Sequence, residues 1–159
     1  MDADALNAMA AHGISLAGRT GGPRLLTPHP GELTRLAQAF TPGAEDSANA
    51  LAAALNATVL SKSARSVVVE AGRPALHNTT GHPMMAKGGF GDVLTGFITT
   101  FAAQGMSLRD AAALGSWLLG FSAEQARLRD GDAVESFTPS RLIEMSGPAL
   151  AALRGGQVW

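Results

Sequence analysis

A glycine-rich turn that runs directly into an apolar helical repeat is the feature that most constrains this chain. The turn holds Gly88, Gly89 and Gly91, and Asp92 follows it. The apolar side chains after it recur on one face of a helix with about 3.6 residues per turn, at Val93, Leu94, Phe97, Ile98 and Phe101. The glycines therefore stand where a helix opens, and the free N–H groups and positive dipole end there attract anions. Glycine also lets the backbone approach a phosphate closely.

Asp92 stands beside this predicted anion site, where a carboxylate would repel a phosphate. An acid is useful at that position if it acts on a hydroxyl group or a metal ion next to the phosphate. Alternatively, Gly91 and Asp92 form only a turn and a helix cap, with the Asp92 side chain accepting from amides of the next turn. This segment alone leaves both interpretations open.

A second segment, residues 25–33, predicts the end of a strand, a rigid turn and the start of a helix. Pro30 suits a first helical position and Glu32 suits the first turn, so we expect Glu32 to cap its own helix rather than reach Mg²⁺. His29 lies between two prolines at the C-terminal edge of the strand, where ligands bind in open α/β sheets. An isolated histidine is usually structural or a cap, but the stiff backbone here favours a side chain aimed at a ligand.

The order of the expected elements favours a layered α/β fold. We expect one domain, residues 1–159, with helices on both faces of a parallel-dominated sheet and a few antiparallel strands late in it. The expected strands are 23–27, 58–61, 66–70 and 74–77. The expected helices are 4–12, 32–40, 46–56, 91–103, 108–128 and 139–153. Lys62 directly follows the second expected strand. It is either a solvent-exposed lysine of a hairpin or a residue that binds a ligand, and the sequence leaves both interpretations open.

The composition excludes several classes of function. The 12 basic and 13 acidic residues give no electrostatic case for binding nucleic acid or an anionic membrane. The chain has no cysteine, which excludes a thiol nucleophile and suits a reducing compartment. We find neither a signal-peptide pattern nor an apolar run long enough to span a bilayer, so we expect a cytoplasmic protein. No metal-binding spacing is present, so any Mg²⁺ would be held mainly by phosphates and water.

Three segments, taken in order, resemble the ADP/ATP-dependent NAD(P)H-hydrate dehydratases, a branch of the ribokinase-like superfamily. They are DADALN at 2–7, TPHPGE at 27–32, and the run 78–87 leading into GGFGDVLTG. The resemblance extends from Asp2 to about Pro148. Family members carry a substantial segment before the DADAL motif, so the chain looks like the C-terminal portion of a ribokinase-like domain. Its sequence differs from the usual family motif at His82, Met84, Lys87 and Phe90.

The resemblance implies that ADP or ATP, with Mg²⁺, drives the removal of water from hydrated NADH or NADPH. The terminal phosphoryl group would pass to the hydrate hydroxyl, and phosphate would then leave. Asp92 would take the hydroxyl proton, Asp92 and His29 would contact the substrate, and the amides at Gly89 and Gly91 would hold the phosphoryl group. The nucleotide segment implied by the family is Lys62, Ser63, Ala64, Arg65 and Ser66. In it Ser63 replaces a glycine, and Arg65 is expected at the surface.

Two other functions stay open beside this one. The chain could be a non-catalytic nucleotide-binding remnant, or half of a two-chain assembly. It could also be a small-molecule hydroxyl kinase, because related superfamily members phosphorylate alcohols with the same Gly-x-Gly-Asp geometry. The TPHPGE run nevertheless favours the dehydratase.

Asn78 and Gly81 precede the glycine run and are candidates for the wall of the site. A chain that starts at a strand end should expose an unpaired edge, which predicts a homo-oligomer or a complementing N-terminal segment.

Overall fold

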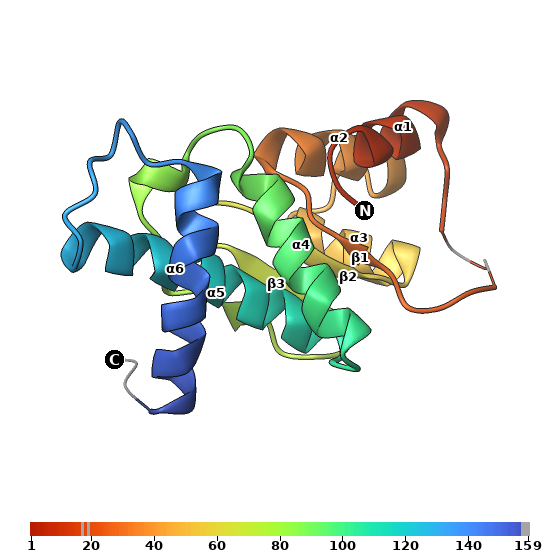
Figure 1. The fold of residues 1–159 in the computed structure, drawn as a ribbon. Coiled ribbons are helices and arrows are strands. Elements are labelled where there is room, and N and C mark those ends of the chain that lie inside the picture. The colour runs from red at the N-terminus through yellow and green to blue at the C-terminus, as the bar shows by residue number, and fades with distance from the viewer. Residues whose placement is uncertain (17, 19, 157–159) are drawn as a thin grey trace.

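The computed structural model describes residues 1–16, 18 and 20–156, and among them four strands form one sheet in the order β1-β2-β3-β4 (Figure 1). β1 (Leu25–Leu26) pairs in parallel with β2 (Thr58–Ser61). β3 (Val67–Val69) pairs antiparallel with β2, and β4 (Leu76–His77) pairs antiparallel with β3. The α/β class is confirmed, but the described sheet is mixed rather than parallel-dominated. The links at 62–66 and 70–75 are too short for a crossover connection, which needs about a dozen residues, so they reverse the chain.

The helices form where the sequence predicts them, with ends displaced by at most two residues. They are α1 (Asp4–His12), α2 (Pro30–Phe40), α3 (Ser47–Leu55), α4 (Phe90–Ala103), α5 (Leu108–Leu128) and α6 (Pro139–Arg154). A short 3₁₀ helix, η1 (Pro83–Met85), was not predicted. It begins where the His82 imidazole accepts a hydrogen bond from the backbone N–H of Met84. None of the described helices combines the length and apolarity needed to cross a membrane.

Alternate residues of the strands belong to two different hydrophobic cores, one on each face of the sheet. One core joins apolar side chains of α4, α5 and α6 to Leu25, Leu60 and Val68. The other core joins those of α1, α2 and α3 to Leu26, Val59 and Val69. In Figure 1 the first helix group, in green to blue, lies to the left of the second, in red to yellow. The expectation of helices on both faces of the sheet is therefore confirmed.

The small residues of α5 allow close contacts that larger side chains would prevent. A Cβ atom added to Gly115 would lie 2.7 Å from Cγ1 of Ile98 on α4. A Cβ atom added to Gly120 would lie 2.6 Å from the carbonyl carbon of Thr80. Gly115 therefore lets α4 and α5 pack together, and Gly120 lets the loop that contains Thr80 lie directly on α5.

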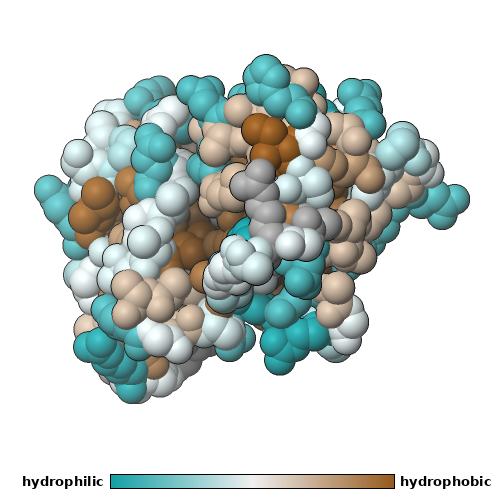
Figure 2. All heavy atoms as spheres, turned by 90° about the vertical axis from the view of Figure 1, so that its right-hand side faces the viewer, coloured by the Kyte–Doolittle hydropathy of each residue, from teal (hydrophilic) through white to brown (hydrophobic). Residues whose placement is uncertain are grey.

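The edge of β1 is paired only with the start of the chain among the described residues. The Met1 carbonyl accepts from the Thr27 backbone N–H at 3.1 Å and from the Thr27 hydroxyl at 3.2 Å. A cavity of about 310 Å³ lies beside this edge, between β1 and the side of α4 that carries Thr95 and Ile98. The face of the molecule on this side is hollowed, and brown apolar side chains lie in the hollow (Figure 2).

Candidate functional site

A cavity of about 780 Å³ gathers most of the predicted site residues. Its wall includes six of them, His29, Lys62, Ser63, Ala64, Ser66 and Gly91, together with Asn78 and Gly81. Three more, Arg65, Gly89 and Asp92, are not part of the wall. Lys62 and the residues after it come from the end of β2, and Gly91 comes from the start of α4. Two segments about 30 residues apart in the sequence thus face the same space.

The glycine turn opens α4, as the sequence predicts. Gly89 is the residue before the helix and has φ 90°, a left-handed conformation that strains other residues. A Cβ atom there would also lie 2.9 Å from Cγ of Pro139. No side chain caps the amino end of α4, so Asp92 is not a helix cap and that alternative is wrong. The first amides of α4 are therefore available to an anion beside Gly91.

Asp92 lies in the first turn of α4 and is exposed. Its carboxylate has no hydrogen bond or ion pair with any residue that the structure describes. An unpartnered carboxylate at the rim of an anion site can accept a proton from a bound hydroxyl group. The geometry thus leaves Asp92 available for chemistry, although it does not line the cavity itself.

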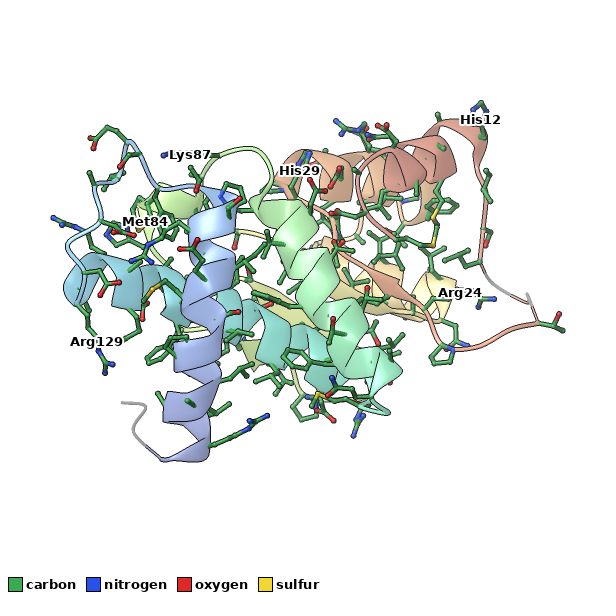
Figure 3. All side chains as sticks on the ribbon, viewed as in Figure 1. His12, Arg24, His29, Met84, Lys87 and Arg129 are labelled. Carbon is green, nitrogen blue, oxygen red and sulfur yellow. The ribbon has the colours of Figure 1, made fainter. Side chains whose placement is uncertain are left out.

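His29 has a structural role, although we expected the stiff backbone between its two flanking prolines to favour a side chain aimed at a ligand. Its Nδ1 accepts from the backbone N–H groups of Gly31 at 3.0 Å and Glu32 at 3.3 Å, so the imidazole caps α2. The buried Glu32 carboxylate accepts from the His29 backbone N–H at 2.8 Å, which confirms Glu32 as a cap. Because Nδ1 is an acceptor, the proton of the neutral ring is on Nε2. The His29 side chain is still 51% exposed and lies near the amino end of α4 (Figure 3). Its Nε2 is 3.5 Å from Glu32 Oε1, so a ligand that accepts from Nε2–H would share this donor with Glu32.

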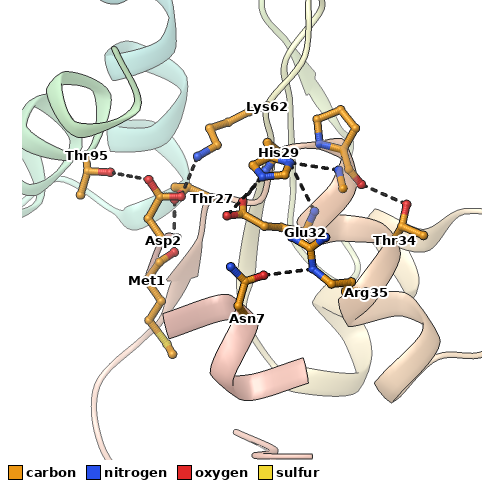
Figure 4. Close-up of polar contacts among 12 residues, drawn as sticks. Met1, Asp2, Asn7, Thr27, His29, Glu32, Thr34, Arg35, Lys62 and Thr95 are labelled. Atoms are coloured by element: carbon orange, nitrogen blue, oxygen red, sulfur yellow. Dashed lines mark hydrogen bonds and ion pairs between the residues drawn. The ribbon is translucent and has the colours of Figure 1, made fainter. Parts of the chain in front are cut away.

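Lys62 is held by Asp2, a residue that the sequence did not single out as part of the site. The Lys62 Nζ donates to Asp2 Oδ1 at 2.6 Å, and the Thr95 hydroxyl donates to Asp2 Oδ2 at 3.3 Å (Figure 4). Burial alone would raise the pKa of the Asp2 carboxyl, but the hydrogen bond and charge of Lys62 outweigh it and the pKa is lowered. The only sequence signal was the place of Asp2 in the DADALN motif, which gave no partner for it.

The segment after Lys62 forms a small turn closed by its own serines. The Ser66 hydroxyl accepts from the Ser63 backbone N–H at 3.2 Å and donates to the Ser63 carbonyl at 3.1 Å. The Ser63 hydroxyl accepts from the Arg65 backbone N–H at 3.1 Å. Arg65 is exposed, as expected. The turn thus presents Ser63, Ala64 and Ser66 to the cavity, whereas Arg65 is not part of its wall.

Lys87 precedes the glycine turn but is engaged with backbone oxygens. Its Nζ donates to the carbonyls of Val134 at 2.6 Å, Glu135 at 2.9 Å and Phe137 at 3.3 Å. In Figure 3 it lies beside the loop that leads into α6. The Phe90 and Phe137 rings stack with their centroids 5.7 Å apart. The α5–α6 loop therefore supports the glycine turn from outside, which no local sequence pattern indicated.

Comparison with known proteins places this geometry in a family. Residues 1–146 match the family model described as NAD(P)H-hydrate dehydratase. The chain belongs to the NAD(P)H-hydrate dehydratase family. A bifunctional NAD(P)H-hydrate repair enzyme from Moorella thermoacetica is 41% identical over 135 residues, which cover 82% of this chain and 25% of that protein.

Solved structures agree with this family and with its ribokinase-like fold. The ADP/ATP-dependent NAD(P)H-hydrate dehydratase from Bacillus subtilis, co-crystallised with ATP and Mg²⁺, has a TM-score of 0.71 and 27% identity. That comparison covers 86% of this chain and 51% of that one. A ribokinase-like superfamily protein from Enterococcus faecalis has a TM-score of 0.67 and 25% identity, over 91% of this chain and 51% of that one. The chain thus spans about half of these structures and about a quarter of the Moorella enzyme.

Proposed function

We propose that the chain provides the nucleotide and catalytic site of an ADP/ATP-dependent NAD(P)H-hydrate dehydratase, which acts in the cytoplasm on hydrated NADH and NADPH. The observation that carries this proposal is the uncapped amino end of α4, with the Lys62 ammonium beside Gly91 and the unpartnered Asp92 carboxylate in the first turn. The family match supports the substrate, and the ATP and Mg²⁺ of the Bacillus subtilis relative support the nucleotide.

Each group has a defined part in this reaction. Asp92 accepts the proton of the hydrate hydroxyl. The oxygen of that hydroxyl bonds to the terminal phosphorus of the nucleotide, and the bond from this phosphorus to the leaving nucleotide breaks. The α4 amides beside Gly89 and Gly91 stabilise the charge on the transferred group. Phosphate then leaves with the electrons of the C–O bond, and loss of a proton from the neighbouring ring carbon to solvent restores the double bond. His29 Nε2–H orients the hydrated nucleotide.

The nucleotide lies along the turn at the end of β2 in this proposal. Lys62 contacts its phosphates, and Ser63, Ala64 and Ser66 form the wall beside it. The described residues contain no group of three or more histidines and acids that could hold a metal ion. Any Mg²⁺ would be held mainly by the nucleotide phosphates and water, as is common for this ion. Its positive charge would neutralise phosphate oxygens that the protein leaves exposed.

The substitution Asp92→Asn tests the proposed base. The rate of dehydration should fall by about 10²–10⁴-fold, while ADP affinity holds or rises slightly because a negative charge near the phosphates is removed. The assay follows the return of dihydronicotinamide absorbance from hydrated NADH in the presence of ADP. Asp110→Asn is the matched control, because Asp110 is also an exposed acid in the first turn of a helix, but on α5 rather than at the glycine turn. Full activity in Asp92→Asn would remove Asp92 from the mechanism.

The products of the same assay decide between the alternatives. A dehydratase releases inorganic phosphate and the reduced cofactor, whereas a hydroxyl kinase leaves a stable phosphate ester. A nucleotide-binding remnant would bind ADP, with a raised melting temperature, and release neither product. Phosphate release in step with absorbance is the result that the proposal requires.

We also propose that the strand pairing that Met1 begins at the edge of β1 is continued by a further strand, from a second copy of the chain or from a complementing N-terminal segment. The backbone of Met1 already pairs with this edge, and the adjacent cavity is lined by side chains of β1 and α4. Exposed strand edges beside apolar surface favour association. Sedimentation at micromolar concentrations should show a species larger than one chain, and a well-behaved monomer throughout would contradict this.

A further inference from the structure

The Asp2–Lys62 ion pair lies directly against the first turn of α4. A Cβ atom added to Gly91 would be 3.7 Å from both Asp2 Oδ2 and Lys62 Nζ. The side chains are mostly shielded from solvent, with 16% of Asp2 and 20% of Lys62 exposed. Lys62 lines the large cavity and Asp2 does not. The lysine thus faces both the cavity and its carboxylate partner.

A lysine in this place needs such a partner for electrostatic reasons. The amino end of a helix carries partial positive charge, which repels an ammonium group placed beside it. The Asp2 carboxylate offsets this repulsion and fixes one end of a flexible four-carbon side chain. It occupies one of the three ammonium donors and leaves the others for a ligand in the cavity. Thr95, one turn along α4 from Gly91, holds the other Asp2 oxygen.

We propose that Asp2 is a positioning residue, which holds the Lys62 ammonium at the amino end of α4 and so prepares the site for the phosphates of a nucleotide. The identity of the anion rests on the proposed function, whereas the positioning does not. Three parts of the chain meet here: the segment before α1, the end of β2, and the first turns of α4. The glycine at position 91 leaves room for the pair beside the helix.

The test measures the affinity for ADP and for inorganic pyrophosphate by titration calorimetry in a double-mutant cycle of Asp2→Asn and Lys62→Gln. Asp2→Asn alone should weaken both ligands by about tenfold, the equivalent of about 1.4 kcal/mol, and the KM for ADP should rise with it. In the Lys62→Gln background, Asp2→Asn should have little further effect, because a residue that acts through Lys62 is silent once Lys62 is gone. Asp4→Asn, an exposed acid in the first turn of α1, is the matched control and should change neither affinity.

Each outcome decides the inference. Unchanged or tighter binding in Asp2→Asn would mean that the carboxylate competes with the ligand, and equal weakening in both backgrounds would mean a purely structural role. Either result overturns the proposal, as does a wild-type chain that binds neither anion. Should Asp2→Asn fail to fold, Thr95→Val removes one of the hydrogen bonds that hold Asp2 and should weaken pyrophosphate binding in the same direction. If the effect of Asp2→Asn on pyrophosphate binding depends on Lys62 but the chain does not turn over the hydrate, this inference stands and only the proposed function is refuted.

Discussion

Replacing Gly120 by alanine should destabilise the fold even though alanine favours helices. The added methyl would lie 2.6 Å from the carbonyl carbon and 2.7 Å from the carbonyl oxygen of Thr80. These are backbone atoms and cannot rotate away, so we take the upper part of the overpacking range, about 3 kcal/mol. The gain in helix propensity is about 1 kcal/mol. The net loss of about 2 kcal/mol should lower the melting temperature by about 4–8 °C in a chain of this size.

Gly96→Ala is the matched control, because Gly96 is also inside a helix but has no atom within 4 Å of an added Cβ. It should gain stability, raising the melting temperature by about 2–4 °C. Thermal unfolding followed by circular dichroism measures both variants. The loop at Thr80 also lines the large cavity, so Gly120→Ala should reduce the rise in melting temperature that ADP produces. A Gly120→Ala chain as stable as the wild type would refute the packing argument.

Two further predictions concern charged groups around the site. Lys87→Met keeps the apolar stem but removes three hydrogen bonds to the α5–α6 loop. We expect a loss of about 1–2 kcal/mol in urea unfolding and weaker ADP binding; unchanged values for both would show that the loop does not support the glycine turn. Asp2 has a lowered pKa in the folded chain, so its stabilising effect is present above the unfolded pKa and is lost as the pH falls through the folded one. The urea midpoint should therefore drop below about pH 4 more steeply in the wild type than in Asp2→Asn, and parallel curves would contradict this.

The local parts of the fold could be predicted because local physics decides them. The glycine turn and the apolar repeat after it identified the start of α4 to within one residue. Strand 23–27 was predicted too long, since only residues that pair count as strand, and β1 is limited to Leu25–Leu26. The His29 cap was visible in its spacing: an N-terminal proline and an acid three residues after the capping residue are typical helix-start signals.

The contacts that complete the site depend on the fold and were not predictable from one sequence. Lys62 was found because it follows a β-branched strand, but its partner Asp2 lies beyond α1, β1, α2 and α3 in the chain. The sequence indicated no partner for Lys87, and its three carbonyl acceptors come from a loop that follows α5. Neither local propensity nor spacing carries information about such pairs.

The long reach of the ion pair also determines when the anion site can exist during folding. Asp2 contacts Lys62 across 60 residues and Thr95 across 93 residues of the chain. Contacts so distant in sequence form only after the entropy of closing those loops has been overcome, so they belong to the late, global stage of folding. A peptide that contains only the glycine turn and α4 would lack the cation beside its first amides. Binding of an anion at this site therefore reports the fully folded chain and no smaller part of it.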